Sequence, residues 1–514
     1  MTPAAFHHRP VRSRVRRNPR RGAIFVTALG IIVILSGMVL VFAQSMQSEA
    51  TTSANRLSYA QANAVEQGAE YWVLANVEAY APDAITMSEI PAEALPVGGG
   101  YFWLLSPNPT TDQTYNYGIV DEAGKVNLNV VGPKGLINPT NLINLPNMTE
   151  ETADAISDWH NPSNQASSDG AESDYYNDLG YNCKNGAYET VEELLLVKGV
   201  DKGLLFGLDL NRDGVVTDAE RQIGGAANAQ MSSISSAFSG GQGLSRGIFE
   251  DLTVYSIDPN KTSTGGSRAN VTTGQTKVEN MLKKALGATK EKQIVDAVYF
   301  RDATTTKGGA AGGKAGGGKA AGGKAGGGKA QLQPRRPPTT VGGFLTRALN
   351  RNAMTNADIK AVIDKLTSST GKTTLGLINV NTASEEVLMC LNGLTQSDAD
   401  ALISQRNNES DLTTIGWVFD ALPQAKALGI VNQIAARSFQ YSGDIVAVSG
   451  DGRAYKRVRI VVDASSLPAK IVYRRDLTSV GWPLSDDIRA TLRSGQKLPT
   501  PTAVGPVQGN TGLP

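Results

Sequence analysis

The N-terminus joins a basic segment to a long uncharged apolar stretch, and this feature limits what the chain can be more than any other. Residues 1–22 contain seven arginines and no acidic residue, and residues 23–43 carry no charge and consist mostly of Ile, Val, Leu and Ala. As an α-helix this stretch rises about 30 Å, the thickness of the hydrocarbon core of a bilayer. Because basic residues stay on the cytoplasmic side, the pattern predicts a single-pass membrane protein with a cytoplasmic N-terminus and an exported body.

The helical pattern continues beyond the apolar stretch to about Val77, whereas a secretory signal has a shorter apolar region that ends in small residues. A basic leader, a glycine before the apolar stretch and one continuous helix together resemble the type IV pilin and pseudopilin family. In that family a prepilin peptidase cuts after the glycine, so the resemblance implies cleavage between Gly22 and Ala23. Pilins usually have Glu five residues after the cut, where this chain has Thr27. An uncleaved single-pass anchor is the alternative.

Charge and composition exclude several classes of function. The chain has 49 basic and 48 acidic residues, and without the leader the balance is 42 to 48, which argues against a strongly basic nucleic-acid protein. Beyond the leader His160 is the single histidine, too few for a histidine-rich metal or catalytic site, so we expect any bound metal to have oxygen ligands. Cys183 and Cys390 either pair in an oxidising compartment or remain two separate buried thiols.

Short β-prone runs lie towards the two ends of the exported body, and the sequence between them is mostly helical. This distribution predicts an α+β fold in which a small antiparallel sheet packs on the N-terminal helix and is interrupted by a large, mainly helical insertion. The β-prone runs are residues 101–105, 115–120, 125–128, 439–448, 454–462 and 469–474.

The predicted division of the chain follows from these patterns. It is a basic leader at 1–22, a helix at 23–78 that spans the membrane at 23–43, the first sheet strands at 79–130, the helical insertion at 131–438, the remaining strands at 439–484 and a C-terminal tail at 485–514. Within the insertion, Gly-Gly-Lys-Ala repeats predict a flexible linker at 304–338, and we also expect the end of the tail to be disordered. The stretch 222–302 has no pattern that assigns it a role.

Two parts of the insertion echo each other and predict related helix-hairpin-helix units. The first combines an Asn-Leu-Asn run at 127–129 with a turn and helix at 145–159, and the second combines 378–383 with 391–406. Such hairpins often bind DNA phosphates through glycine-bearing turns and nearby basic residues. Here the turns have few glycines and the adjoining helices are acidic, so we expect packing modules and do not favour nucleic-acid binding.

The whole layout resembles the type II secretion system protein K family, the largest of the minor pseudopilins. The resemblance implies a protein of the inner membrane with a periplasmic body, which caps or initiates the tip of a pseudopilus through contacts with other minor pseudopilins. It also implies that the protein is not an enzyme and that the non-acidic fifth position is normal. The resemblance is carried by the leader and by residues 121–129, 156–159, 169–176, 191–199, 252–256 and 378–383.

Two acidic segments are candidate calcium sites. The first contains Asp158, Asp169, Glu172 and Asp174, whose charges repel unless they are solvated or bound to a hard cation. Members of the resembled family bind calcium near this segment, and because the sequence matches only in part, the resemblance implies a reduced site. A solvated acidic loop is the alternative.

The second segment, residues 209–220, has a complete twelve-residue calcium-loop pattern. In such loops oxygen ligands occupy positions 1, 3, 5, 7, 9 and 12, and a glycine at position 6 permits the turn. Those positions are filled by Asp209, Asn211, Asp213, the backbone carbonyl of Val215, Thr217 and Glu220, with Gly214 at position 6. We expect a structural calcium ion here, and a polar turn without metal is the alternative.

One pattern typical of enzymes occurs, the G-x-S-x-G sequence at 243–247. A nucleophile elbow needs a preceding buried strand and a histidine base, and neither is predicted here, so we do not expect hydrolase activity. The leading prediction is a minor pseudopilin at the pseudopilus tip. The runner-up is a membrane-anchored helix-hairpin-helix protein that binds DNA for uptake.

Overall fold

The computed structural model describes residues 19–83, 90, 92–109, 111–227, 246–301 and 333–499. These residues belong to two compact units, 1–60 and 61–514. Helix α1 (Pro19–Tyr80) is one continuous α-helix whose apolar part has no buried side chain in the protein. By length and composition it could cross a membrane, which suggests membrane anchoring, as predicted.

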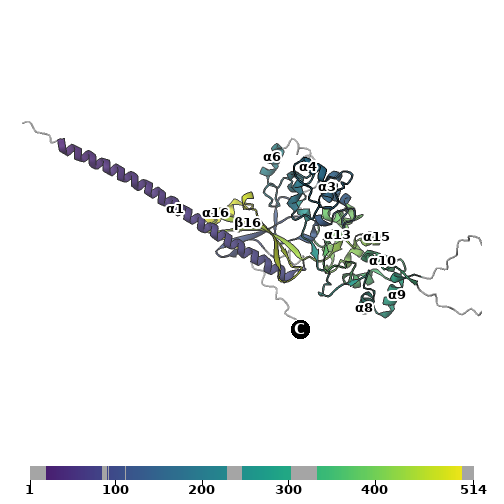
Figure 1. Cartoon of the computed structure of the whole chain (residues 1–514). Helices are drawn as coiled ribbons and strands as arrows, with labels where there is room; N and C mark the ends of the chain where they lie inside the picture. The colour runs from purple at the N-terminus through teal and green to yellow at the C-terminus, as the bar shows by residue number, and fades with distance from the viewer. Residues whose placement is uncertain are drawn as a thin grey trace, which may run out of the picture. The chain divides into compact units, whose positions relative to one another are not determined.

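The second unit contains an antiparallel sheet with the strand order β1-β2-β15-β16-β17 (Figure 1). Two further short strands extend it, since β3 pairs with β2 and β4 pairs with β15. The predicted antiparallel sheet is therefore present. Its strands are β1 (Leu95–Val97), β2 (Gly100–Pro107), β3 (Tyr115–Tyr117), β4 (Val120–Asp121), β15 (Gln440–Val448), β16 (Tyr455–Asp463) and β17 (Lys470–Asp476).

The last turns of α1 cover one face of this sheet. Val65, Ala69, Val73 and Val77 recur every four residues, which places them on one side of the helix, and all four are buried. They pack in one hydrophobic cluster with side chains of the three central strands, namely Phe102, Leu104, Tyr441, Ile445, Ala447, Val458, Ile460 and Val462. This spacing explains why the helical pattern of the sequence runs well past the apolar stretch.

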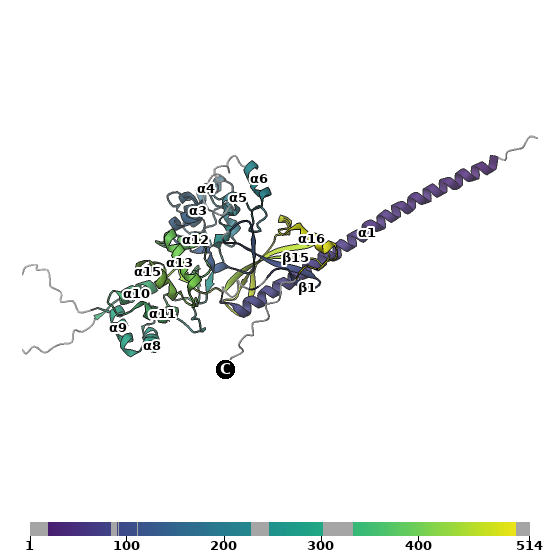
Figure 2. The same ribbon diagram turned by 180° about the vertical axis from the view of Figure 1, so that it is seen from behind.

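The opposite face of the sheet is covered by the chain that follows β17. Figure 2 shows helix α16 (Asp486–Arg493) beside the sheet. Its Leu492 lies in one hydrophobic cluster with Trp103, Val446 and Val448, and Trp482 packs edge-on against Trp103. Residues 485–514 had been predicted as a tail, and their first part instead completes a hydrophobic core. Both faces of β2 are therefore buried, which is why its sequence shows no alternation of polar and apolar residues.

The chain between β4 and β15 is mainly helical and has its own large hydrophobic core, which runs from Val126 to Ile434. Helices α8, α9 and α10 lie together at one end of this part in both views (Figures 1 and 2), and Figure 2 shows α11 near them. Its α-helices are α3 (Glu150–His160), α4 (Ser173–Asp178), α5 (Lys202–Phe206), α6 (Asp218–Ala227), α8 (Gln275–Leu286), α9 (Ala288–Tyr299), α10 (Val341–Leu349), α11 (Asn356–Val362), α12 (Glu385–Met389), α13 (Gln396–Asn408), α14 (Val418–Ala421) and α15 (Gln424–Ile430).

Pairs of two-residue strands tie distant segments of this helical part together. The predicted run at 125–128 contributes β5 to such a pair and not to the main sheet. Residues 333–334, at the end of the predicted linker, form another pair with 300–301. The pairs are β5 (Val126–Asn127) with β6 (Leu252–Thr253), β7 (Ile257–Asp258) with β12 (Thr374–Leu375), β8 (Ala269–Asn270) with β11 (Leu366–Thr367), β9 (Phe300–Arg301) with β10 (Gln333–Pro334), and β13 (Ile378–Asn379) with β14 (Ile434–Ala435).

The two echoing segments form similar local structures. A 3-10 helix (Pro139–Asn144) leads through a turn to α3, and α12 leads through a turn to α13. Each turn contains one residue with positive φ, Asn147 at 57° and Gly393 at 75°. Each second helix starts at a threonine cap, Thr149 or Thr395. Their assignment as helix-hairpin-helix units remains a prediction, as does their role in packing.

Candidate functional site

The helical part is joined to the sheet by buried polar contacts that centre on Asp121. Its Oδ2 accepts hydrogen bonds from Asn379 (2.9 Å), Thr382 (2.5 Å) and Ser438 (2.7 Å). Burial raises the pKa of Asp121, and these donors oppose the rise because they stabilise the carboxylate. One side chain at the end of β4 thus connects the sheet to residues more than 250 positions away.

A buried ionic network lies beside this junction. Lys125 bonds Glu122 at 2.9 Å and Glu250 at 3.4 Å, and Arg459 holds Glu250 with two bonds of 2.9 and 3.0 Å. Burial acts to raise the pKa of Glu250, but Arg459 and Lys125 outweigh it and hold that pKa well below its usual range. A network in which every charge is paired fixes the position of the 246–251 loop on the sheet.

Arg457 of strand β16 contacts the predicted calcium loop, residues 209–220. Arg457 is fully buried, and its guanidinium bonds the carboxylate of Asp444 at 2.6 and 3.0 Å. It also donates to the backbone carbonyls of Asn211 (2.6 Å) and Arg212. Tyr115 adds a hydrogen bond of 3.0 Å to Asp213. The loop is therefore hydrogen-bonded to the sheet through the backbone carbonyls of Asn211 and Arg212 and through the side chain of Asp213.

The loop 209–220 has the compact turn that its sequence predicts. Arg212 and Gly214 have positive φ values of 56° and 85°, and Asp209 accepts hydrogen bonds from the backbone nitrogens of Asp213 and Gly214 at 3.0 and 2.8 Å. Glu220 folds back over the loop and accepts a bond of 2.9 Å from the nitrogen of Thr217. The predicted ligand positions thus lie in one closed loop.

The donor set suits calcium chemically, because it consists of oxygens at the spacing a hard cation requires. Burial raises the pKa of Asp209 to about 7, with the charge of Asp213 adding to the rise, and burial raises the pKa of Asp213 to about 6. Two buried carboxylates that resist ionisation together are stabilised by a bound cation. Within the described residues, however, no three His, Cys, Asp or Glu side chains are already gathered around one point.

The first acidic segment is only partly assembled. Asp158 is buried and bonds Ser167 through both its oxygens at 2.8 Å, whereas Asp169 and Asp174 are exposed. Glu172 is buried, and within the described part of the chain neither of its carboxylate oxygens has a hydrogen-bond partner. Burial raises the pKa of Glu172. An unpaired buried carboxylate is costly, so Glu172 fits a cation ligand better than Asp169 or Asp174 does.

The remaining predicted residues are placed as follows. Gly22 and Ala23 lie within α1, where Thr27 bonds the carbonyl of Ile24 at 3.0 Å. Cys183 and Cys390 are both buried and free, so they do not form the disulfide that the sequence left open. Ser245 of the G-x-S-x-G sequence and residues 304–332 of the linker lie outside the described residues.

Several residues that hold the helical part to the sheet were not predicted as functional. Asp121, Glu250 and Arg457 form contacts with residues distant in sequence, and no local motif marks such partners. One signal was present in β16, where basic residues alternate with Val458, Ile460 and Val462. Because the apolar side of this strand faces α1, its basic side faces the inserted helices.

These features define a class of protein: an α+β protein with a long apolar N-terminal helix and an antiparallel sheet interrupted by helices. Residues 133–208 and 378–436 each match a family model described as type II secretion system (T2SS), protein K. The two matches confirm the predicted resemblance to the type II secretion system protein K family. They support the implication of that resemblance that the chain is a minor pseudopilin of such a system.

Other comparisons add little. None of the curated proteins matches the chain. Among solved structures, a chain of the GspK-GspI-GspJ complex from the type 2 secretion system of enterotoxigenic Escherichia coli is similar at 8% identity and a TM-score of 0.36. The similarity covers 83% of this chain and 99% of that chain.

Proposed function

We propose that this protein initiates or caps the tip of the periplasmic pseudopilus of a type II secretion system. The supporting observation is that the two family segments pack on each other and on the sheet as one body. Asn141 of the first segment bonds Asn392 of the second at 2.7 Å, and Gln433 bonds the carbonyl of Leu136. A bulky helical body fixed to the sheet would stop further subunits from adding above it.

The proposed partners are other minor pseudopilins, and the protein itself is proposed to have no enzymatic activity. Purified full-length chain in detergent should form a stoichiometric complex when it is mixed with the minor pseudopilins of its own secretion system. Size-exclusion chromatography with light scattering measures this directly. Monomers at every mixing ratio would contradict the tip role.

We further propose that a prepilin peptidase removes residues 1–22 and leaves the protein anchored in the inner membrane, with the N-terminus cytoplasmic and the body periplasmic. Co-expression with the peptidase should give an intact mass that lacks Met1 to Gly22. A Gly22→Val variant should keep its full mass and serves as the control. A wild-type chain that stays uncleaved would make it a single-pass anchor, and the DNA-uptake alternative would then gain weight.

The DNA-uptake alternative requires measurable affinity for duplex DNA. Lys198, in the turn between the 3-10 helix at Val191–Leu196 and α5, bonds Glu151 at 2.9 Å, so this cation is already partly neutralised. Because phosphate contacts release counterions, real binding would weaken steeply as salt rises. A fluorescence-anisotropy titration at several salt concentrations tests this, and we expect no salt-sensitive binding.

For the cofactor we propose structural calcium. The loop 209–220 would hold one ion through Asp209, Asn211, Asp213, the carbonyl of Val215, Thr217 and Glu220, and the ion would supply the positive charge that the buried carboxylates need. A second, weaker site would use Glu172 and Asp158, with Asp169 and Asp174 as outer ligands after a loop movement. Calcium counted by mass spectrometry after dialysis in calcium buffer tests both sites, with Glu220→Gln and Glu172→Gln each expected to remove one ion.

A further inference from the structure

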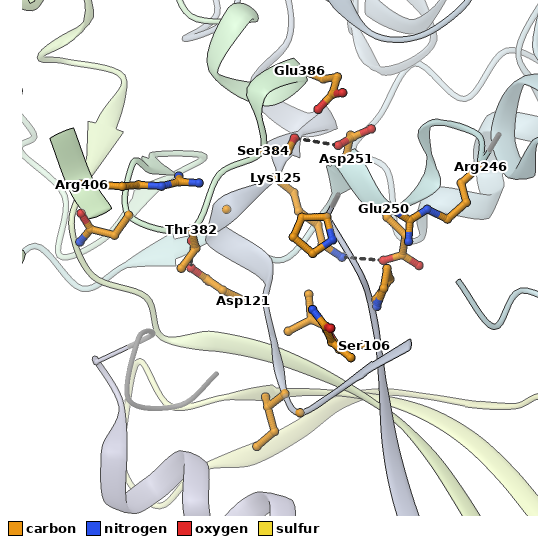
Figure 3. Close-up of a pocket in the computed structure, with 18 of the residues that line it drawn as sticks. Ser106, Asp121, Lys125, Arg246, Glu250, Asp251, Thr382, Ser384, Glu386 and Arg406 are labelled. Carbon is orange, nitrogen blue, oxygen red and sulfur yellow. Dashed lines mark hydrogen bonds and ion pairs between the residues drawn. The ribbon is translucent and has the colours of Figure 1, made fainter. Parts of the chain in front are cut away.

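A cleft of about 730 Å³ with both polar and apolar walls lies where the ends of β2 to β4 meet the helical part (Figure 3). One wall is formed by strand ends and turns at 106–109 and 116–121. The other walls are the loop 246–251, the segment 381–386 at the start of α12, and Arg406 in the last turn of α13. A cleft of this size accommodates a ligand of several hundred daltons and is far larger than a single ion.

Four carboxylates that line the cleft form no ion pair among the described residues, namely Asp121, Asp251, Glu386 and Glu409. Asp121 accepts three side-chain hydrogen bonds and Glu409 accepts two from backbone nitrogens, which leaves Asp251 and Glu386 with the fewest partners. Asp251 accepts a hydrogen bond of 3.0 Å from Ser384, and Figure 3 shows Glu386 beside it. Neither forms an ion pair among the described residues, because the nearby Lys125 is already engaged by Glu122 and Glu250. Burial, with the charge of Glu386 added, raises the pKa of Asp251 to about 7. The carboxylates of Asp251 and Glu386 therefore favour the binding of a positively charged ligand group.

Arg406 is a cation in the same cleft that lacks a carboxylate partner among the described residues. It is held in place by hydrogen bonds from Nη1 to the carbonyls of Val380 (3.2 Å) and Ala383 (2.7 Å), and it forms no ion pair with a carboxylate of the described chain. Burial alone lowers its pKa. Figure 3 shows it entering the cleft from the side away from Arg246. A guanidinium fixed by backbone carbonyls has donors left over for a carboxylate.

We propose that this cleft binds an extended polypeptide segment of another protein, which presents a lysine or arginine side chain to Asp251 and Glu386 and a carboxylate to Arg406. A polypeptide fits because opposite charges stand at separate places in a cleft whose walls also include Pro107, Pro146 and Leu412. Such a segment pairs Asp251, Glu386 and Arg406 at once and covers the apolar parts of the wall. The inference does not rest on the proposed tip role, because the cleft belongs to the fold of the second unit alone.

The test uses the full chain in detergent, in one calcium-containing buffer for all peptides and variants. The probes are acetylated and amidated glycine peptides in which one Lys and one Glu are separated by zero to three glycines, and matched peptides with Ala at both positions. Isothermal titration calorimetry should show saturable binding of at least one charged peptide below about 10 mM, and none of the Ala peptides. Equal responses to charged and Ala peptides would overturn the proposal.

Variants then assign the binding to these side chains. The double variant Asp251→Asn, Glu386→Gln should weaken binding by about tenfold or more, and Arg406→Gln should do the same. Glu385→Gln is the matched control, since Glu385 is next to Glu386 on α12 but does not line the cleft. Glu386→Lys should instead acquire affinity for a peptide with two Glu residues, which a misfolded variant could not do. Unchanged affinity in the double variant, or equal losses in Glu385→Gln, would overturn the proposal.

Discussion

At the scale of single residues, the most informative side chain is Arg457. It was visible in the sequence as one basic residue of a strand, yet its partners Asp444, Asn211 and Arg212 come from two other parts of the chain. Burying a guanidinium is costly unless each of its donors is satisfied, so an arginine in this position indicates a joint between parts of a fold.

Replacing Arg457 by Met should therefore leave Asp444 buried without its cation. We expect the free energy of unfolding to fall by about 3–5 kcal/mol. Urea titration of the full chain in detergent measures the loss. Arg453→Gln is the control, because Arg453 is half-exposed and its pair with Asp451 spans 3.6 Å, so its loss should cost about 0.5 kcal/mol or less. Adding Asp444→Leu to Arg457→Met should recover part of the stability, and no recovery would contradict the pairing argument.

Glu66 provides a pH prediction. It is fully buried between α1 and β17, where Arg474 bonds one of its oxygens at 2.8 Å and the other oxygen has no hydrogen-bond partner among the described residues. Burial raises the pKa of Glu66 to about 7, the neighbouring Glu70 adds to the rise, and Arg474 opposes it. Between the ordinary pKa of a glutamate and pH 7, the folded protein therefore binds more protons than the unfolded chain. Stability should fall as the pH rises through this window.

The measurement is the urea midpoint at pH 5, 6 and 7.5, read as the difference between the wild type and Glu66→Gln. Because Gln does not ionise, the variant should lose the part of the pH dependence that Glu66 contributes, and it should be relatively more stable at the highest pH. Glu78→Gln, on the same helix, serves as the control for a general effect of removing a carboxylate. Parallel pH profiles for wild type and Glu66→Gln would contradict the prediction.

At the scale of elements, the sequence predicts the helices and strands that have a local periodic pattern. It does not predict the elements and contacts that depend on residues distant in the chain. Helix α1 and strands β2, β15, β16 and β17 carry periodic or β-prone runs, and all were predicted close to their observed bounds. Helix α16 was predicted as part of a tail, because two large apolar side chains four residues apart, Ile488 and Leu492, are too short a pattern to predict a helix before the sheet face it covers is known. The junction at Asp121 could not be predicted, since its partners follow it by more than 250 residues.

The two hairpins give a prediction that belongs to this scale. Their turns use Gly393 and Asn147 at equivalent places with positive φ. A Cβ at Gly393 would meet no atom within 4 Å, so a substitution there changes the backbone energy and not the packing. Gly393→Ala should lower the free energy of unfolding by about 1 kcal/mol, because an L-residue with a side chain is less stable than glycine at positive φ. Asn147→Gly should be neutral or slightly stabilising. The melting temperatures of the two variants test this prediction. Equal losses of stability in both variants would contradict the inference that the two turns require the same positive-φ conformation.

At the scale of the whole molecule, the loop 209–220 connects the proposed calcium to the architecture. Its backbone is bonded to Arg457 of the sheet, and the carbonyl of Gly214 accepts a bond of 3.1 Å from Arg246, whose loop continues to the ionic network at Glu250. An ion that stiffens the loop therefore stiffens the attachment of the helical part to the sheet. For the exported body that we propose, this is a reason to bind the proposed structural ion.

Chelation should consequently lower the melting temperature of the full chain by several degrees. A ligand at a hundred times its dissociation constant stabilises the folded state by about 2.7 kcal/mol, which corresponds to a shift of about 2–4 °C per kcal/mol in a large domain. Glu220→Gln should remove most of the response to chelator, and Glu172→Gln a smaller and independent part, because the two sites share no ligand. Glu385→Gln should respond as the wild type does. If chelator leaves the wild-type melting temperature unchanged, the carboxylates of the loop are held by their backbone hydrogen bonds alone and the calcium proposal fails, while the contacts of Arg457 would still join the helical part to the sheet.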